Sequence, residues 1–411
     1  MVLAIYDAKL DKAKNTIEQW IKDKEDARGM MMRYRKLGKT GMEASIIGLG
    51  AEHLDGKDYD IVKETFDAAI EHGVNMVDVF MPGRDIRQKI GKAIKGNRDK
   101  LIIQGHIGST DINQQYDVSR DITLCKKYFD SLLSDLGTDY IDFGMLFHID
   151  NEKDFDMVFN SDIVRYAEEL KRNGIIRAIG ASSHDPIIAK KMVETGIIEL
   201  LMFSVNPAFD MIPAEINATH FLMEDFDRSI MLEIDKERQD LYKTCERLDI
   251  PITVMKTLGG GKLISKVHAP FSKPLTVSQC IHYALTRPAV SSVLIGCQSK
   301  KHVEEAIAYL ATDPADLDYT EAIRSMNDNF KGSCVYCNHC LPCPSGIDIA
   351  AVTKYLDIAV MDERTVETLQ HYRDLPAHSS DCIECGNCES KCPFSVPIIK
   401  NMEKAFEIFG F

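Results

Sequence analysis

The chain alternates over most of its length between short apolar runs rich in β-branched residues and longer stretches with apolar residues every three or four positions. The first pattern is typical of buried strands and the second of amphipathic helices. Strands are predicted at residues 45–49, 76–80, 101–107, 140–147, 175–180, 200–205, 252–255 and 291–295. Helices are predicted to follow them at 59–72, 86–95, 119–136, 154–172, 186–195, 235–247, 276–286 and 300–310. Eight β–α units in a row predict an α/β fold, a closed (β/α)8 TIM barrel over residues 33–312.

Two segments of the predicted barrel depart from this alternation. A hairpin around residues 34–41 precedes the first strand and is expected to plug the bottom of the barrel. A long excursion, residues 206–234, follows the sixth strand and contains aromatic and apolar residues among its acids. Because β–α loops rise over the C-terminal face, where barrel enzymes keep their active sites, this excursion is predicted to be a lid or a contact with the C-terminal domain.

The barrel is flanked by two further segments. Residues 1–32 carry a narrow apolar stripe that predicts an amphipathic helix. This helix could dock a second subunit in a homo-oligomer. Packing against its own barrel also explains the stripe and is favoured. After the barrel come a polar connector at 313–333, helices predicted at 350–360 and 364–372, and a closing helix near 401–409 that is apolar enough to pack back onto the barrel. The residues of the N-terminal stripe are Leu10, Ala13, Ile17, Trp20 and Ile21.

Two runs of cysteines near the end of the chain carry the clearest chemical signal. Both are spaced for [4Fe–4S] clusters, and each ends in a cysteine followed by proline. In bacterial two-cluster ferredoxins that last cysteine binds the cluster of the other run. Residues 313–411 are therefore predicted to form a ferredoxin-like, helix-rich domain with two [4Fe–4S] clusters. One cluster would be bound by Cys334, Cys337, Cys340 and Cys392, and the other by Cys382, Cys385, Cys388 and Cys343.

Two structural zinc knuckles are the main alternative, because tetrathiolate zinc sites also use cysteine pairs. Zinc needs only two pairs for each ion, however, and would leave the unbroken four-cysteine runs and both Cys-Pro steps unexplained. Disulfides fit less well, because clusters built from reduced thiolates belong in a reducing cytoplasm. The remaining cysteines, Cys125, Cys245, Cys280 and Cys297, lie singly in apolar patterns and are predicted to be buried core residues.

Composition narrows the class of protein. Hydrophobic residues make up 45% and charged residues 27% of the 411 residues, as in soluble globular proteins. No run of eighteen apolar residues and no N-terminal signal-like segment is found, so a cytoplasmic protein without a membrane span is expected. The net charge of −14 argues against binding to nucleic acid. An acidic surface suits a basic redox partner, and it suits simple solubility equally well.

Several segments resemble the aldo-keto reductase superfamily. They are residues 32–41, 73–78, 140–142 and 175–184, and the cysteine-rich tail resembles that of the ferredoxin-fused branch of this superfamily. The resemblance implies a TIM barrel that binds a small-molecule substrate. In this family NADPH reduces carbonyls with the help of an aspartate, a tyrosine acid, a lysine that lowers the pKa of the tyrosine, and a histidine that orients the carbonyl.

Three residues are the resulting catalytic candidates. Asp78 matches the aspartate of the family, whereas Gly83 stands where the tyrosine should be. His106 occupies the lysine position, and the histidine position falls on Phe147, with His148 one residue on. Because neighbouring strand ends lie ~5 Å apart, Asp78 is expected to orient His106 as the acid–base group, with His148 as second choice. A satisfied buried hydrogen bond left from ancestry is the alternative.

The nucleotide positions that the resemblance implies are mixed. Ser182 and Ser183 replace a Ser-Asn pair that holds the carboxamide, and Met202 replaces a glutamine. Glycines can let a backbone approach a diphosphate, and a helix start with lysines attracts phosphate. NADP(H) or a flavin is therefore a candidate cofactor. The further candidate residues are Gly259, Gly260, Gly296, Ser299 and Lys300.

Three functions remain open from the sequence. The favoured one is an anaerobic iron–sulfur oxidoreductase with substrate at the barrel mouth and electrons relayed by two clusters, since a hydride donor would make one-electron carriers superfluous. The second is an NADPH-dependent carbonyl reductase with structural clusters, and the third a non-catalytic electron-transfer or redox-sensing protein. A crowded set of polar residues at the predicted mouth argues against the third: His53, Asp78, Arg84, His106, His148 and Lys256.

Overall fold

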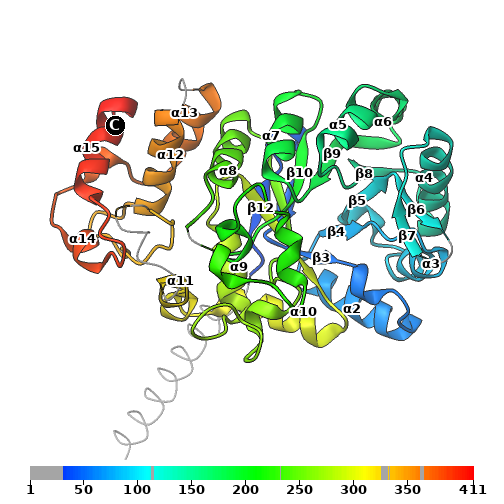
Figure 1. Ribbon diagram of the computed structural model, residues 1–411, viewed down its shortest axis with the longest axis horizontal. Coiled ribbons are helices and arrows are strands. Elements are labelled where there is room, and N and C mark those ends of the chain that lie inside the picture. The colour runs from blue at the N-terminus through cyan, green and yellow to red at the C-terminus, as the bar shows by residue number, and fades with distance from the viewer. Residues whose placement is uncertain (1–30, 113–114, 232, 325–331, 333, 362–364) are drawn as a thin grey trace, which may run out of the picture.

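Eight parallel strands close into a barrel surrounded by helices, and the C-terminal helices form a separate unit beside it (Figure 1). The computed structural model describes residues 31–112, 115–231, 233–324, 332, 334–361 and 365–411. Nearly all of the N-terminal helix predicted for residues 1–32, and with it the suggested oligomer contact, lies outside the described residues. The barrel strands are β3 (Ile47–Gly50), β4 (Met76–Val79), β5 (Ile102–Ile107), β8 (Ile141–Leu146), β9 (Ile176–Ser183), β10 (Leu200–Ser204), β11 (Ile252–Met255) and β12 (Val290–Gly296).

Each strand pairs with the next one in that order, and β12 closes the barrel on β3. The surrounding helices confirm the predicted β–α alternation, with one difference. The single helix predicted for residues 154–172 is two helices, because Ser161 caps the second with its side chain and ends the first. The helices are α2 (Tyr59–Glu71), α3 (Arg84–Ala93), α4 (Ile122–Leu136), α5 (Glu152–Phe159), α6 (Asp162–Arg172), α7 (Pro186–Glu194), α8 (Lys236–Leu248), α9 (Val277–Leu285) and α10 (Lys300–Ile307).

The bottom of the barrel is closed by the predicted N-terminal hairpin. Its strands β1 (Tyr34–Lys36) and β2 (Glu43–Ser45) pair antiparallel. Leu37 between them is fully buried and packs in one cluster with Met76 and Ile102, residues that begin barrel strands. With its N-terminal end filled by side chains, the barrel offers space for a ligand only at the opposite end.

Two loops build the upper rim. The excursion after β10 contains short 3-10 turns, among them η5 (Ala218–Leu222), and Lys262 holds it by donating to the carbonyl of Phe221 at 2.8 Å. Leu222 lines the cavity at the barrel mouth, so this excursion forms part of the cavity wall, and we call it the lid. An additional hairpin, β6 (Ser109–Ile112) and β7 (Gln115–Val118), follows β5 and was not predicted, because its short strands lack an apolar alternation.

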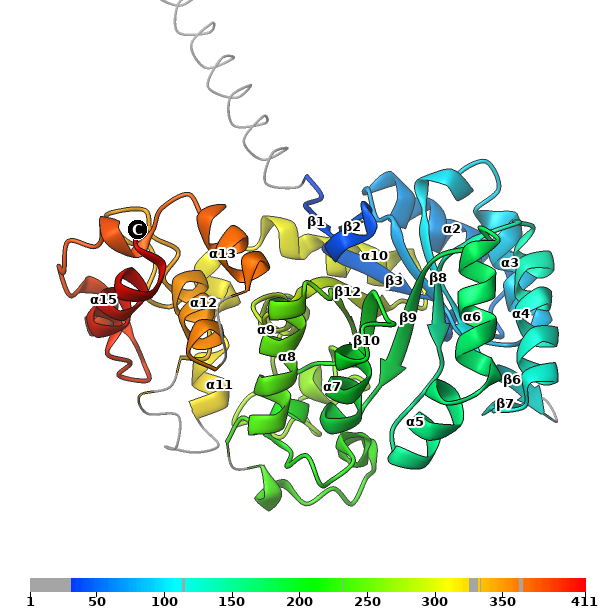
Figure 2. The same ribbon diagram turned by 90° about the horizontal axis from the view of Figure 1, so that it is seen from above.

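The C-terminal unit consists of helices and loops. Figures 1 and 2 both place it on the side of the barrel formed by α8 and α9. Its closing helix, α15 (Ile398–Phe409), packs mainly on α12 (Ile349–Met361), and Phe409 stacks on Tyr372 of α13 (Val366–Arg373) with ring centroids 4.0 Å apart. The expectation that this helix returns to the barrel was therefore wrong. Helices α12 and α13 instead contact α8. The helices are α11 (Thr320–Arg324), α12 (Ile349–Met361), α13 (Val366–Arg373), α14 (Asn387–Lys391) and α15 (Ile398–Phe409).

None of the described helices is long and apolar enough to cross a bilayer.

A buried carboxylate holds the two units together. Glu246 of α8 lies 3.4 Å from the ammonium of Lys354 and 3.3 Å from the imidazole of His371, both in the C-terminal unit. The hydrogen bond and charge of Glu246 raise the pKa of His371 above its usual 6.5. A second ion pair across the same junction, Lys39 with Glu367 at 2.8 Å, is largely exposed.

We expect Glu246→Gln to weaken domain docking by about 3 kcal/mol, because it leaves a buried Lys354 without its counter-charge. Glu367→Gln, the matched control at the exposed pair, should cost less than ~1 kcal/mol. Thermal unfolding of the holoprotein, followed together with limited proteolysis between the units, measures both effects. Equal losses in the two variants would contradict the role assigned to Glu246.

The same contact predicts a pH dependence of docking. A histidine whose pKa is raised in the folded state stabilises the fold fully below its unfolded pKa, near 6.5, and this contribution disappears as the pH rises through the folded pKa. Resistance to proteolysis at the junction should therefore fall as the pH is raised from 6 toward neutrality and beyond. His371→Gln should remove this part of the pH dependence.

Candidate functional site

A cavity of about 770 Å³ opens at the C-terminal mouth of the barrel. Its volume lies within the range of small-molecule and cofactor sites. The lid, the β6–β7 hairpin and the loops after β11 and β12 form its upper walls. All three predicted catalytic residues line it, together with Ser182, Gly260 and Gly296.

Asp78 and His106 form a buried pair at the floor of the cavity. Asp78 lies near the end of β4 and His106 near the end of the neighbouring β5. The imidazole Nε2 is 2.7 Å from the Asp78 carboxylate, and both side chains are almost fully buried. Gln104, two residues before His106 and on the same face, donates to the same carboxylate oxygen at 3.1 Å. The predicted Asp78–His106 contact is thus confirmed, while its catalytic role stays a prediction.

The surroundings of His106 are aromatic. The rings of Phe80 and Phe147 lie 6.1 and 5.1 Å from its imidazole, both edge to face. The remaining nitrogen, Nδ1, is buried and has no hydrogen-bond partner among the described residues. Because a buried polar atom normally has a partner, this nitrogen is where a ligand in the cavity could form a hydrogen bond.

The position of the family tyrosine carries no side chain here. Gly83 is the N-cap of α3. Among the described residues that line the cavity, the single tyrosine is Tyr116 of the unpredicted hairpin. Its ring contacts Phe80 at 5.6 Å but is half exposed, and burial together with the nearby Glu52 raises its pKa. Tyr116 is therefore a rim residue and does not restore the missing acid.

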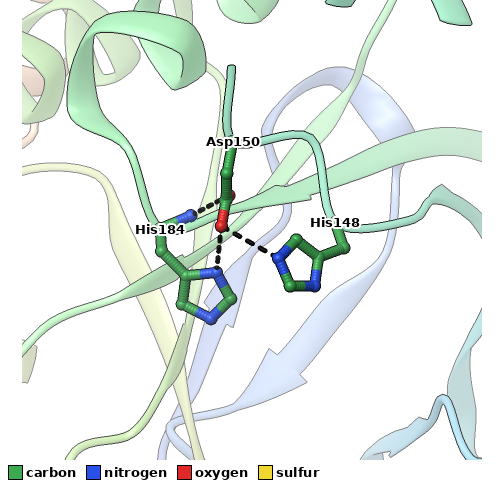
Figure 3. A group of neighbouring side chains, drawn as sticks. All are labelled: His148, Asp150 and His184. Carbon is green, nitrogen blue, oxygen red and sulfur yellow. Dashed lines mark hydrogen bonds and ion pairs between the residues drawn. The ribbon is translucent and has the colours of Figure 1, made fainter. Parts of the chain in front are cut away.

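His148 belongs to a second polar group on another wall. Its Nε2 lies 3.0 Å from the carboxylate of Asp150, and Nδ1 of His184 lies 2.9 Å from the same oxygen (Figure 3). The nitrogen Nζ of Lys256 is 3.0 Å from the other ring nitrogen of His184. The sequence analysis missed Asp150 and the role of His184, although both follow the ends of neighbouring strands, β8 and β9, which was the available signal.

The predicted serine positions are occupied by structural contacts. Ser182 accepts a hydrogen bond from the backbone N–H of His148 at 2.8 Å, so it supports that residue as well as lining the cavity. Ser183 is fully buried and donates to Asp150 at 3.1 Å, outside the cavity lining. A nicotinamide carboxamide would have to compete with these contacts.

The predicted glycines serve close packing. A Cβ on Gly259 would meet the ring of Phe221 at 2.9 Å, and one on Gly260 would meet Leu222 at the same distance. Both glycines have positive φ, +56° and +63°, which favours glycine over other residues. A Cβ on Gly296 would meet the His53 ring at 2.6 Å. These glycines let the lid and His53 approach the backbone, and the lid covers part of the proposed diphosphate path.

The remaining candidates lie at the edge of the site or outside it. Ser299 is the N-cap of α10, and Lys300 pairs with Glu304 within this helix at 3.7 Å, so neither lines the cavity. Arg84 is three-quarters exposed and pairs with Asp135, away from the cavity. His53 and Lys256 do line it, as predicted.

The eight cysteines of the C-terminal unit gather in two places. Cys343, Cys382, Cys385 and Cys388 line one small cavity, whose other walls are largely apolar. Burial raises the pKa of Cys337 to about 11 and that of Cys340 to about 12, and in both cases the nearby Cys392 thiol contributes. Cys392 therefore lies near Cys337 and Cys340 of the first run, Cys388 of the second run also acts on Cys340, and Cys343 lies with the second run. This arrangement fits the crossed ligand sets predicted from the sequence.

The sulfur atoms are spaced more widely than the four ligands of a bound zinc ion. No three of these eight cysteine sulfurs, all of them described, lie within 4.8 Å of one another. A tetrahedral zinc site with Zn–S bonds of about 2.3 Å would place its sulfurs about 3.8 Å apart. Thiolates that bind separate irons of a cluster are spread more widely, so the donor set fits iron–sulfur clusters.

Comparison with known proteins identifies both units. The model of the aldo/keto reductase family matches residues 46–279. The chain belongs to the aldo/keto reductase family. A model described as a 4Fe-4S dicluster domain matches residues 333–397, so the C-terminal unit of this aldo/keto reductase is an iron–sulfur domain.

Individual relatives agree with this assignment. An uncharacterized oxidoreductase of Bacillus subtilis, YqkF, is 28% identical over 67% of this chain and 90% of its own. The aldo-keto reductase YhdN of the same organism is 31% identical over 37% of this chain and 47% of its own. The holo form of aldo-keto reductase AKR11C1 from Bacillus halodurans shares the fold, with a TM-score of 0.54 at 20% identity, over 72% of this chain and 96% of that one.

Cys343→Ala should damage the cluster of Cys382, Cys385 and Cys388, because Cys343 lies in their cavity rather than with its own run. We expect about half of the iron and sulfide to be lost, with the spectroscopic signal of one cluster retained. Cys297→Ala, which alters a buried cysteine of the barrel, is the matched control and should keep all the iron. If this variant loses the cluster of Cys334, Cys337 and Cys340 first, the assignment of Cys343 to the other cluster is wrong.

Proposed function

We propose that this aldo/keto reductase is an iron–sulfur oxidoreductase that acts on a small molecule in the barrel cavity, with His106 as acid–base group and electrons relayed through the C-terminal domain. The observation that carries the proposal is the buried Asp78–His106 contact of 2.7 Å at the floor of the cavity. His106 takes the position of the family lysine there, and Gly83 leaves the tyrosine position without a side chain. The two [4Fe–4S] clusters would supply or accept single electrons when bound.

The residues of the barrel account for proton transfer. Asp78 accepts the hydrogen bond of His106 and thereby fixes the orientation and the tautomer of the ring. Phe80 and Phe147 stack on each other and cover one side of the His106 ring. When Nδ1 also carries a proton, the imidazolium can give that proton to a substrate atom at the moment when that atom gains electrons. The lid adds the apolar side chain of Leu222 to the wall of the cavity.

A chain of buried contacts joins the iron–sulfur domain to the cavity wall and supports a functional link. Arg287 donates to the carbonyl of Val335, next to Cys334, and its guanidinium lies over the Tyr283 ring at 4.4 Å. Tyr283 donates to Asp210 at 2.7 Å.

From Asp210 the chain of contacts continues to the cavity. Arg238 donates to Asp210 at 3.2 Å and reaches the carbonyl of His184 at 3.5 Å. All members of this chain are buried, so packed side chains connect the first cysteine run to the cavity wall. Electrons that enter through the cysteine domain would thus reach the barrel through packed protein.

Hydride transfer from NADPH finds less support. Ser183 is committed to Asp150, and Phe221 and Leu222 cover the glycines after β11.

An anaerobic preparation of the protein decides between single-electron transfer and hydride transfer from NADPH. We expect turnover of a carbonyl panel with a reduced viologen dye as one-electron donor, and none with NADPH; activity with NADPH alone would contradict the proposal. Mass spectrometry of released cofactor shows whether a flavin is present.

His106→Gln and Asp78→Asn should each lower turnover by roughly 10²–10⁴, because they remove the proton donor or its orienting partner. Cluster content should not change, since both residues lie in the barrel. His72→Gln, at an exposed histidine on the outer surface, is the control for the histidine substitution and should keep wild-type turnover. Steady-state rates with the dye make the measurement, and full activity in both site variants would refute the assigned chemistry.

A further inference from the structure

A second carboxylate–imidazole system borders the cavity, and its lysine comes from the strand opposite that of His106. It consists of Asp150, His184 and Lys256, which we call the lysine relay. Lys256 directly follows β11, and β11 and β5 are four strands apart in the eight-stranded barrel. Lys256 and His106 therefore approach the same cavity from opposite sides.

The hydrogen bonds of the lysine relay allow one consistent assignment of protons. Oδ1 of Asp150 accepts from the backbone N–H of His184 at 2.7 Å and from the Ser183 hydroxyl. Its Oδ2 accepts from Nδ1 of His184 at 2.9 Å. With the proton on Nδ1, Nε2 of neutral His184 has a lone pair, so Lys256 donates to it at 3.0 Å. Asp150 thus fixes the tautomer that lets His184 hold the ammonium.

The backbone around the relay is strained. Lys256 has a φ of +58°, and His148, which contacts Asp150 of the relay, has a φ of +52°. Non-glycine residues rarely adopt such values. Asn206 fixes the first by donating to the Lys256 carbonyl at 2.9 Å, and Arg120 fixes the second by donating to the His148 carbonyl at 2.7 Å. Strain that surrounding contacts maintain in a cavity wall is typical of functional residues.

Charges on several elements act on the Lys256 ammonium. Burial lowers its pKa, while Glu52 and Asp150 raise it to a smaller extent. Burial likewise lowers the pKa of His184, which keeps this imidazole neutral. The hydrogen bonds from His148 and His184 hold the pKa of Asp150 well below its usual range despite burial. A lysine whose pKa is lowered toward neutrality is a suitable proton donor.

A divalent metal is the alternative occupant, because the ligand atoms of His148, Asp150 and His184 lie within 4.8 Å of one another. Two histidines and one carboxylate can form a metal site. A metal-binding histidine, however, almost always donates its other N–H to an acceptor. Here the other nitrogen of His184 faces the ammonium of Lys256, which is a donor. The contacts therefore favour a hydrogen-bonded relay.

We propose that Lys256 is a second proton donor to the substrate, with His184 and Asp150 as its positioning residues. The inference rests on the proposed function. Reduction of a carbon–oxygen or carbon–carbon double bond by single electrons takes up two electrons and two protons, whereas a hydride donor leaves only one proton to be supplied. The electrons come from a low-potential one-electron donor. His106, as the imidazolium, supplies one proton from Nδ1 and becomes the neutral imidazole, and the Lys256 ammonium supplies the other and becomes a neutral amine. Solvent then returns a proton to each of the two groups.

The first test needs no substrate. Anaerobic holoprotein is labelled with acetic anhydride over a range of pH, and mass spectrometry gives the extent of labelling at Lys256 and at the exposed Lys266. We expect Lys256 to reach half-labelling at a lower pH than Lys266, and at a lower pH still in Asp150→Asn, since Asp150 favours the charged ammonium. Equal midpoints at the two lysines, or no labelling of Lys256, would overturn the proposal.

The second test separates proton donation from simple charge. Arginine keeps the charge but does not give up a proton at ordinary pH. Lys256→Arg and Lys256→Met should therefore both lower kcat by roughly 10²–10⁴, while Lys266→Met keeps the wild-type rate. Wild-type kcat in Lys256→Arg would overturn proton donation by Lys256. Loss of kcat in the Lys256 variants with full activity in His106→Gln would refute the proposed acid–base group instead.

The metal alternative has its own measurement. Elemental analysis of the holoprotein and of His148→Ala should give equal metal content, all of it iron accompanied by sulfide. One further zinc, cobalt or iron per chain that disappears in His148→Ala would overturn the lysine relay.

Discussion

The closed parallel pairing of eight strands is the constraint on which the site depends. In a closed barrel each strand has two fixed neighbours, and alternate side chains must point inward. The register between β4 and β5 pairs Asp78 with Gln104, so Gln104 and His106, two residues apart, both face the interior beside the carboxylate. A shift by one residue would have turned all these side chains outward. The plugged bottom then leaves the opposite mouth as the place where such residues meet a ligand.

The polar residues of the cavity show how this chain departs from its family. The positions that would hold a tyrosine and a lysine carry Gly83 and His106, and the site relies on a histidine–aspartate contact instead. A separate group of His148, Asp150, His184 and Lys256 lies on another wall. His148 and Lys256 have positive φ, and hydrogen bonds from Arg120 and Asn206 hold their carbonyls. Two hydrogen-bonded acid–base systems in one cavity suit chemistry that moves several protons, more than they suit transfer of a single hydride.

The iron–sulfur domain depends on the barrel for its position and on its thiolates for its fold. The part of it that the structure describes contains no strand, and its core centres on α12, α15 and the stacked Tyr372 and Phe409. Metal–thiolate bonds generally replace a large apolar core in units of this kind. Glu246 and Arg287 fix it against the barrel through buried charges, which are directional and so define one orientation.

Local patterns of the sequence determined the barrel and the cysteine domain, and the resemblance to the aldo/keto reductases placed Asp78 and His106 at the ends of neighbouring strands. Strand periodicity, cysteine spacing and the position of a residue at a strand end all survive without knowledge of distant neighbours. Only the tertiary structure decided that His148 lies with Asp150, His184 and Lys256, which come from three different strand ends. It also decided that Phe221 and Leu222 cover the glycines after β11. These contacts depend on how long loops fold over the mouth, and loop packing follows from three-dimensional shape, which no short sequence pattern records.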